Sequence, residues 1–432
     1  MIKILNAYTQ ELDDPGRAVR EIHDSLDIKN KLLKNSVALL FCHAKFIEMG
    51  VAEAVYKNLP FDVVGCTSLY FGLPAIAGTP AIAGTPAIAG TPATAGAPAA
   101  AGATVVDGGV ILSVTILTSD DISFAAGISG PLNEKKTEEC IQELFRRTAS
   151  SLEEKPSLAF AFPPTMTSVP ADIMAASLDR VCPGLPVFGT VALDMGVHIQ
   201  HPKTIFKTTG QTAGQTTGQA AGESGAFSDR LALLLFKGQV KPRFFHSLFP
   251  EKSILSWDAV ITEAAGNRII SINNRPALSF LKDMGFFQDG MYESILVYPL
   301  VVNYPNNETN VVVLQDISPE GQLMCSRNVQ AGGILNLGAV TAESVLESAR
   351  TIARDLKNGD SGAGFIMFSC FLRNVALGGS SQSEFELVCK ELNGYAGSWL
   401  FINSGGELCP GYTENGELVN QFHQYALIAC QF

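Results

Sequence analysis

The sequence predicts an α/β protein built from diverged βαβ units with mixed sheets, two domains and two low-complexity loop insertions. Three stretches, residues 37–67, 158–190 and 365–402, each contain a short apolar run, a helical segment and a second apolar run. Such runs suit strands buried on both faces, and a strand, a helix and a strand in that order imply a parallel pair. We place the domain boundary after residue 237, which gives domains of residues 1–237 and 238–432.

The third unit shows this pattern most clearly. Residues 365–368 and 399–402 are its two predicted strands. The helix between them follows a Gly-Gly-Ser turn and has apolar residues at intervals of three and four, with charged residues between them: Phe385, Val388, Cys389 and Leu392 against Glu384, Glu386, Lys390 and Glu391. Loops at the carboxyl ends of parallel strands are the usual place for a ligand, and here these loops are predicted at residues 369–374 and 403–407.

The N-terminal domain follows the same rules. Asp13-Asp14-Pro15 caps a first helix, whose Val19 and Ile22 share one face. The further predicted helices are residues 47–58, 133–152 and 171–181. The predicted strands are residues 2–6, 37–42, 62–67, 110–117, 158–162, 187–190, 204–207 and 231–236.

The first part of the C-terminal domain has a different pattern of predicted strands and turns from the βαβ units. Asn273-Asn274 predicts a turn, and Pro276 begins a helix that runs to Met284. The predicted strands around it are residues 269–272, 295–302, 311–318 and 322–328. This spacing predicts an antiparallel section rather than further βαβ units. A long helix over residues 342–356, capped by Thr341 and closed by Gly359, then leads into the third unit.

Two low-complexity inserts interrupt the N-terminal domain. Residues 75–102 repeat AIAGTP with increasing imperfection, and residues 208–223 repeat a four-residue pattern. A hexapeptide period can indicate a left-handed β-helix, but five units make fewer than two coils, and the proline in each removes a backbone donor. We interpret both inserts as flexible loops at the tips of hairpins, where a long loop costs little additional closure entropy.

Composition and charge narrow the possible functions. The 432 residues carry a formal net charge of −12, and no Lys/Arg cluster opposes it, which argues against nucleic acid and anionic lipid as partners. The N-terminus has no apolar signal-peptide core, and the longest charge-free stretch contains too many prolines for a membrane helix. Nine cysteines without a C-x-x-C pair are typical of buried thiols in a reducing compartment. We expect a cytoplasmic protein.

Candidate ligand-binding residues lie where the predicted strands end: Gly65, Cys66, Thr67, Gly189, Ser369, Cys370, Arg373 and Glu407. Backbone N–H groups and hydroxyls there could bind a carboxylate, and Arg373 is the charge placed to pair with it bidentately. Glu407, on the loop after the neighbouring strand, is the rival partner for Arg373. The structural alternative is that the glycines and Ser369 make tight turns and that Arg373 lies on the surface.

Two other kinds of chemistry need residues that the sequence supplies only in part. A nucleophilic Cys66 or Cys370 would make the protein a cysteine-dependent hydrolase or transferase, but neither has a histidine near it in sequence. A haem needs an axial ligand and an apolar pocket; the candidate ligands are His43, His246 and His423, without a C-x-x-C-H pattern. We expect no catalytic residue and no resident cofactor, and we keep haem as an alternative.

Metal and nucleotide sites find little support. His198 and His201 are the close histidine pair, but their segment leads through Pro202 into a strand, whereas this spacing suits a metal on a helix. The glycine pairs at residues 332–333 and 378–379 match neither G-x-G-x-x-G after a strand nor a Walker A motif. We therefore expect neither a metal nor a nucleotide.

Several short motifs resemble the FIST proteins, which pair a FIST N domain with a FIST C domain. They occur in the family order over nearly the whole chain apart from the inserts: Val64-Gly65-Cys66-Thr67, Leu185-Pro186-Val187-Phe188-Gly189, Asn274-Arg275-Pro276-Ala277-Leu278, Phe368-Ser369-Cys370, Arg373, Gly406-Glu407-Leu408 and Phe422-His423. The resemblance implies a cytoplasmic sensory module that binds an amino acid or a similar metabolite. Some similar proteins bind haem and sense nitric oxide.

The same resemblance bears on the output of the protein. FIST proteins pass their signal to a histidine kinase, a cyclase or a chemotaxis receptor; the sequence contains no such region, so we expect a separate signalling partner. The chain departs from the family pattern at Phe401 and Ser404, where the family has Gly and Thr, and at residues 422–426. These changes put the details of the pocket in question.

Overall fold

The computed structural model describes residues 2–69, 110–152, 154–166, 168–194, 202–209, 224–285, 299–305, 309–359, 363–378, 381–413 and 415–432. The insert at residues 75–102 lies outside these ranges, as does the second insert beyond residue 209. The pair His198 and His201 and the beginning of the strand predicted at residues 295–302 also lie outside them.

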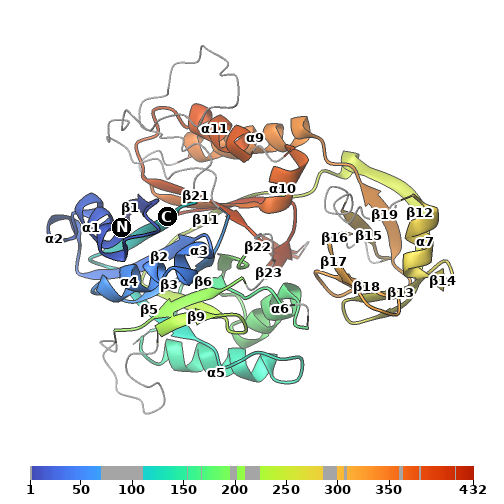
Figure 1. The fold of residues 1–432 in the computed structure, drawn as a ribbon, viewed down its shortest axis with the longest axis horizontal. Helices are drawn as coiled ribbons and strands as arrows, with labels where there is room; N and C mark the ends of the chain where they lie inside the picture. Colours follow the sequence, from blue (N-terminus) through green and yellow to red (C-terminus); the bar gives the residue numbers. More distant parts are fainter. Residues whose placement is uncertain are drawn as a thin grey trace.

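Three sheets form the body of the protein, and each contains one of the predicted parallel pairs (Figure 1). The first sheet has the order β1 (Lys3–Thr9), β4 (Leu112–Ser119), β2 (Asn35–Cys42), β3 (Val63–Thr67), β8 (Thr204–Lys207), β9 (Ser224–Phe227). Its helices are α1 (Pro15–Leu26), α2 (Ile28–Lys31), α3 (Lys45–Glu48) and α4 (Val51–Asn58). The predicted helix over residues 47–58 is wrong as one unit, because Gly50 has φ +71° and separates α3 from α4.

The second sheet combines strands from both halves of the chain. Its order is β23 (Leu418–His423), β22 (Glu407–Tyr412), β7 (Val187–Thr190), β6 (Leu158–Phe162), β10 (Ala232–Lys237), β5 (Ser123–Ile128). Helices α5 (Thr137–Ala149) and α6 (Ala171–Val181) cover it. The helix α5 is shorter than the predicted residues 133–152, because Asn133 caps a turn ahead of it by accepting hydrogen bonds from two backbone N–H groups.

The third sheet carries the third βαβ unit. Its order is β11 (Arg243–Ser247), β24 (Leu427–Gln431), β20 (Phe365–Cys370), β21 (Trp399–Ser404), and its helices are α9 (Ala342–Asn358), α10 (Phe371–Ala376) and α11 (Ser381–Glu391). The pairs β2–β3, β6–β7 and β20–β21 are all parallel, which confirms the three predicted units.

The inner faces of the three sheets share one hydrophobic core. Phe41 of β2, Phe162 of β6 and Phe368 of β20 meet there. The centroid of the Phe41 ring lies 5.7 Å from that of Phe162 and 5.8 Å from that of Phe368. Phe188 of β7 stacks on Phe368 at 5.2 Å. Aromatic pairs at these separations add about 0.5 to 1.5 kcal/mol each beyond their buried area. The core therefore holds the three parallel pairs side by side.

The remaining sheet forms a separate unit, which we call the β module (residues 254–338), shown at the right of Figure 1. Its strands are β16 (Thr309–Val312), β15 (Leu300–Asn303), β19 (Ile334–Gly338), β12 (Ile254–Ala265), β13 (Arg268–Ile272), β18 (Leu323–Cys325), β17 (Leu314–Ile317) and β14 (Arg275–Pro276). It also holds helix α7 (Ala277–Asp283), and the short 3-10 helix η1 (Glu251–Ser253) precedes it. All its strand pairs are antiparallel, as predicted, and it has its own core.

Two features of the β module differ from the prediction. The strand predicted over residues 311–318 is divided into β16 and β17, because Val313 between them exchanges hydrogen bonds with Ser326 instead. The long strand β12 was missed; register shifts along its pairings with β13 and β19 interrupt the alternation that marks a strand. None of the helices in the described ranges combines the length and apolarity that a membrane-spanning helix requires.

Candidate ligand-binding site

The carboxyl ends of the three parallel pairs meet at one short segment after β7. The Val191 N–H donates to Gly406 O at 2.9 Å, and the Leu193 N–H donates to Thr67 O at 2.9 Å. The N–H of Ala192, which lies between them, donates to the carbonyl oxygen of Pro163 just after β6 at 3.0 Å. The structure therefore brings the predicted site regions of all three units to one place.

Gly65 and Gly189 have a structural role in their strands. A Cβ on Gly65 would overlap the carbonyl oxygen of Leu40 on β2, and a Cβ on Gly189 would overlap that of Ala161 on β6. These glycines allow the backbones of a parallel pair to approach closely. Their role as ligand contacts stays a prediction.

Cys66 and Thr67 are buried within the body. Cys66 belongs to the central core, and burial raises the pKa of its thiol, with a smaller contribution from the neighbouring Cys42. The Thr67 backbone N–H donates to Lys203 O at 2.8 Å, and its hydroxyl accepts from the Lys203 N–H at 2.9 Å. Thr67 thus holds the chain that enters β8.

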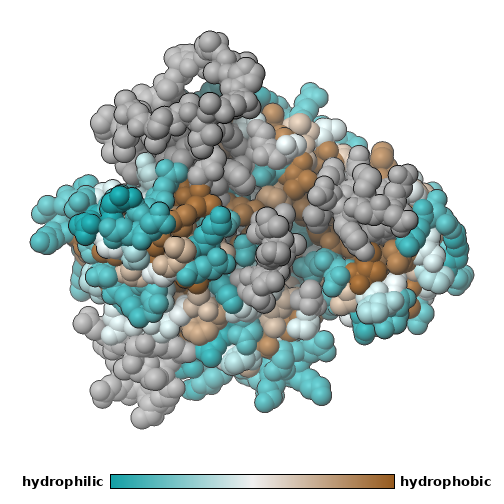
Figure 2. Space-filling view, in the orientation of Figure 1, coloured by the Kyte–Doolittle hydropathy of each residue, from teal (hydrophilic) through white to brown (hydrophobic). Residues whose placement is uncertain are grey.

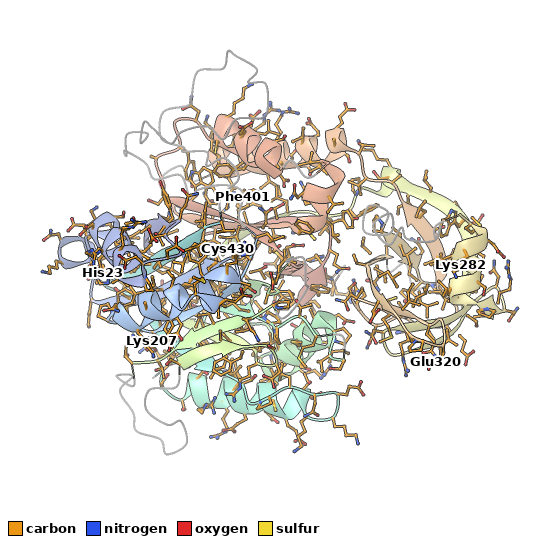
Figure 3. All side chains as sticks on the ribbon, in the orientation of Figure 1. His23, Lys207, Lys282, Glu320, Phe401 and Cys430 are labelled. Atoms are coloured by element: carbon orange, nitrogen blue, oxygen red, sulfur yellow. The ribbon has the colours of Figure 1, made fainter. Side chains whose placement is uncertain are left out.

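Ser369 and Cys370 belong to β20, so the loop predicted at residues 369–374 is wrong: β20 runs to Cys370 and α10 follows directly. Successive strand residues point to opposite faces of a sheet. Ser369 faces α11, whereas Cys370 packs in a cluster with Leu372 and Tyr425. Figure 3 shows the same division, with Phe401 toward the helices and Cys430 toward the other sheets.

Arg373 of α10 pairs with Glu384 of α11. Its Nε and Nη2 donate to the same carboxylate oxygen at 3.0 and 2.6 Å, and the two side chains are 3% and 1% exposed. The other oxygen of Glu384 accepts from the Ser369 hydroxyl at 2.7 Å. The expectations that Arg373 lies on the surface or pairs with Glu407 are therefore wrong, because a protein acid closer in sequence reaches it first.

The remaining donors of Arg373 join α10 to α9. Nη2 shares its two N–H groups among Glu384, Val345 O at 3.0 Å and the Ser348 hydroxyl at 2.8 Å. Nη1 makes one long contact, 3.4 Å to Tyr425 O. A buried guanidinium needs such partners, since an unpaired charge in the interior is costly. Nη1 is the part of the guanidinium with the weakest hydrogen bonding.

Glu384 was missed because it was assigned to the polar face of its helix. It lies four residues before Val388 and eight before Leu392, both of which are buried in the core beneath α11. A carboxylate on the apolar stripe of a helix must find a buried partner. That position was the signal in the sequence, and it could have identified Glu384 as the acid facing Arg373.

Glu407 lies in β22 and is completely buried, at 0% exposure. The loop predicted at residues 403–407 is wrong, because β21 extends to Ser404 and only Gly405 and Gly406 form the turn. Burial raises the pKa of Glu407 well above its usual range; the Ser404 hydroxyl, which donates to Oε1, and Arg373 oppose this shift only in part. Burial therefore favours the protonated, neutral form of Glu407.

Three buried oxygens near these strand ends make no hydrogen bond of good geometry: Glu407 Oε2, Asn374 Oδ1 and Asn403 Oδ1. Asn374 is 3% exposed and Asn403 is 2% exposed. Buried polar atoms are nearly always paired, so each of these oxygens is a candidate acceptor for a ligand group. A group that donates several hydrogen bonds would complement this set.

The β module covers the site from one side. Val313 packs with Cys370, Leu372 and Tyr425, and apolar side chains gather where the module meets the body (Figure 2). Across the same junction the Ser326 hydroxyl donates to the Gln424 side chain at 2.5 Å. The module and the body therefore enclose the strand ends together.

The described histidines His246 and His423 and the thiol of Cys370 lie in surroundings that disfavour haem binding and nucleophilic chemistry. His246 and His423 stack with ring centroids 6.4 Å apart, and burial is the main cause that lowers the pKa of His423 to about 4. His246 lines a cavity that also holds the carboxylates Glu347 and Asp355, a polar wall unlike an apolar haem pocket. Burial also raises the pKa of the Cys370 thiol, which disfavours the nucleophilic thiolate.

Comparison with known proteins gives two matches along the chain. The model of the FIST N domain matches residues 36–275, and the model of the FIST C domain matches residues 277–410. The first match contains the first two βαβ units, and the second contains the third unit, Arg373 and Glu407. No curated protein matches the chain.

Proposed function

Because the chain belongs to the FIST family, a family of sensory domains in signal transduction, we propose that it is a cytoplasmic, non-enzymatic sensory module. It binds a small ligand, an amino acid or a similar metabolite, where the three parallel pairs end. Its signal passes to a separate protein such as a histidine kinase, a cyclase or a chemotaxis receptor. The domain boundary after residue 237 also stays a proposal.

The observation that supports this proposal most directly is the set of three buried oxygens without a hydrogen-bond partner, on Asn374, Asn403 and Glu407. A buried polar atom left without any partner costs about 1 to 3 kcal/mol. Cofactor-free catalysis finds no comparable support, since the buried thiols are protonated. Binding, rather than chemistry, is what this arrangement serves.

An amino acid would match the site at both ends. Its ammonium group has three N–H donors, which suit the unpaired oxygens of Asn374, Asn403 and Glu407. Its carboxylate would approach Nη1 of Arg373, the guanidinium edge with only one long contact. In this arrangement Glu384 holds Arg373 in place, and the ligand takes the donor that Glu384 leaves.

The experiment is a thermal-shift screen of the full chain against amino acids and related amines. A ligand that binds only the folded state raises the melting temperature with concentration. For a hit, Asn403→Ala and Asn374→Ala should each weaken binding about tenfold, as expected for the loss of one hydrogen bond to a charged group. Asn58→Ala is the matched control, because Asn58 is exposed and bonds only the Ala54 carbonyl of its own helix.

Two results would contradict the proposal. One is a screen in which no amine or amino acid shifts the melting temperature. The other is a hit whose affinity is unchanged by Asn403→Ala and Asn374→Ala. A Soret band on addition of haem, lost when His246 or His423 is replaced, would instead support the gas-sensor alternative.

A further inference from the structure

The strand β11 forms one edge of the third sheet. It pairs with β24 on one side, from Arg243 opposite Gln431 to Ser247 opposite Leu427. Within the described part of the chain, no strand or side chain bonds the backbone of its other side. An edge of this kind presents unpaired N–H and C=O groups that can receive another strand.

Helix α9 runs alongside this edge and leaves a cavity of about 570 Å³ against it. One wall consists of five consecutive residues, 244–248, and continues through Pro250 and Lys252. The other wall consists of positions on one face of α9: Ser344, Glu347, Ser348, Thr351, Ile352 and Asp355. A strand edge that faces a helix across a groove is the arrangement in which some domains bind an extended peptide by adding it to their sheet.

The side chains of the groove indicate what such a peptide would carry. Glu347 and Asp355 give the helix wall two carboxylates, and Ser344 and Thr351 add hydroxyls. Glu347 also pairs with Arg350 of α9, and Lys252 is a cation of the lining, so the charged lining residues remain acidic on balance. Leu248, which is 42% exposed, supplies an apolar contact at one end of the strand wall. The net charge of −12 on the whole chain adds a long-range attraction for a basic segment.

The prolines on either side of β11 limit the length of the added strand. Pro242 precedes it and Pro250 follows it, and a proline has no N–H to offer to a neighbouring strand. Such prolines also protect an edge from indiscriminate pairing. The five residues of β11 span about 16 Å at 3.3 Å per residue, enough for a short peptide motif.

We propose that the groove between β11 and α9 binds an extended basic peptide, which adds to β11 as a fifth strand of the third sheet. The peptide carries Lys or Arg facing Glu347 and Asp355 and an apolar residue at an alternate position facing Leu248. Resting on the sensory function proposed above, this peptide belongs to the signalling partner. The free edge, the helix wall and its charge support this assignment without reference to the small ligand.

The groove also connects to the candidate ligand site. Ser348 lines the groove, and its hydroxyl accepts a hydrogen bond from Arg373 Nη2. Arg373 in turn pairs with Glu384, which accepts from Ser369 at the end of β20. A peptide in the groove and a ligand at the strand ends would therefore act on the same buried network, which gives the two sites a physical means of coupling.

The test uses the full chain and a fluorescein-labelled peptide, Val-Lys-Val-Arg-Val-Lys-Thr, followed by fluorescence anisotropy. Two peptide controls share its length: one has Glu in place of Lys and Arg, and the other has Pro in place of the central Arg. We expect saturable binding of the basic peptide and at least fivefold weaker binding of both controls, since one removes the charge match and the other removes a main-chain donor.

Protein variants locate the binding. Glu347→Gln and Asp355→Asn should each weaken the basic peptide about fivefold, as for one exposed ion pair, whereas Glu53→Gln on α4, outside the groove, should not. Hydrogen exchange should show protection of β11 amides when the peptide is bound. Absence of saturable binding, equal binding of the acidic control, or protection elsewhere would each overturn the proposal. None of these results depends on the small-ligand screen, so the two proposals fail separately.

Discussion

Arg373 and Glu384 form a buried ion pair that joins α10 to α11 directly above the end of β20, with Nη2 2.6 Å from Oε1. The pair fixes the start of the helix after the parallel strand, because Ser369 of β20 donates to the same carboxylate. The position of the site therefore depends on a contact between two helices, whereas Glu407 comes from a strand, β22.

Loss of one partner from this pair should be costly. We expect Glu384→Ala to lower the free energy of unfolding by about 3 to 5 kcal/mol, because it leaves the Arg373 guanidinium buried without its acid. Denaturant unfolding of Glu384→Ala, Arg373→Ala and the double variant measures this loss. The double-mutant cycle should be clearly non-additive, since each single variant already breaks the pair.

An exposed ion pair of α9 offers the matched control. Arg354 lies 3.1 Å from Glu391 and is 57% exposed, so Arg354→Ala should cost less than about 1 kcal/mol. If Glu384→Ala were no more destabilising than Arg354→Ala, the buried pair would not hold α10 to α11.

The glycines of the first two units should tolerate no side chain. We expect Gly65→Ala and Gly189→Ala each to lower the free energy of unfolding by about 1 to 3 kcal/mol, because the new Cβ overlaps a backbone oxygen of the partner strand. Gly411→Ala is the control, since a Cβ there meets only the Gln421 side chain at 3.4 Å. Thermal unfolding of the three variants measures this difference. If Gly65→Ala and Gly189→Ala had the same melting temperature as Gly411→Ala, the explanation by close approach of the strands would be refuted.

The sequence predicted the three parallel pairs because each is specified locally. The apolar runs of β2, β6 and β20 are long enough to be buried on both faces, and the helices after them have clear apolar stripes. The arrangement of the sheets was not predictable in this way. The pairing of β22 with β7, which joins residues more than two hundred positions apart, depends on tertiary packing that no local pattern records.

The strand ends that carry the candidate residues were predicted, but the contacts of these residues were not. Arg373 and Glu407 lie at the expected strand ends, but strand periodicity alone could not show that Arg373 meets Glu384. The unpaired Asn374 and Asn403 were missed, because an asparagine at a strand or helix end usually forms a turn. Only burial, which is a property of the whole fold, distinguishes these from ordinary capping residues.

The two tryptophans report on two different parts of the molecule. Trp257 lies in β12 of the β module, and Trp399 lies in β21 of the body. The largest fully buried side chains of the described residues all belong to the body, so we expect the module to unfold at lower denaturant concentration. Fluorescence-detected unfolding of Trp399→Phe and Trp257→Phe follows each part separately. Coincident transitions would show that the two units unfold together.

His423 should make the fold sensitive to mild acid. Burial, the nearby His246 and Arg327 lower its pKa to about 4, whereas an unfolded histidine titrates near about 6.5. Between these values the unfolded state binds the additional proton, so stability falls as the pH decreases from about 6.5 to about 4. We expect His423→Gln to reduce this slope in melting temperature against pH. An unchanged slope would contradict the assignment.

Glu407 should change stability with pH in the direction opposite to His423. Its folded pKa is raised by burial, whereas an unfolded glutamate titrates near about 4.3. As the pH rises above about 4.3 the unfolded state loses its proton first, so stability decreases until the raised folded pKa is passed. Glu407→Gln keeps a neutral side chain and removes the contribution of Glu407 to the pH dependence of stability. We expect its melting temperature relative to wild type to rise as the pH increases above about 4.3.

The same variant also tests whether Glu407 faces the ligand. An ammonium group bound at Oε2 favours the carboxylate, so binding of an amine to the wild-type protein should release a proton. Calorimetry in buffers of different ionisation enthalpy measures that release, which Glu407→Gln should abolish while the exposed Glu417→Gln keeps it. Equal proton release from wild type and Glu407→Gln would place the amine elsewhere, even if Glu407→Gln changed the pH dependence of stability as expected. The two measurements therefore separate the effect of burial on Glu407 from its contact with a ligand.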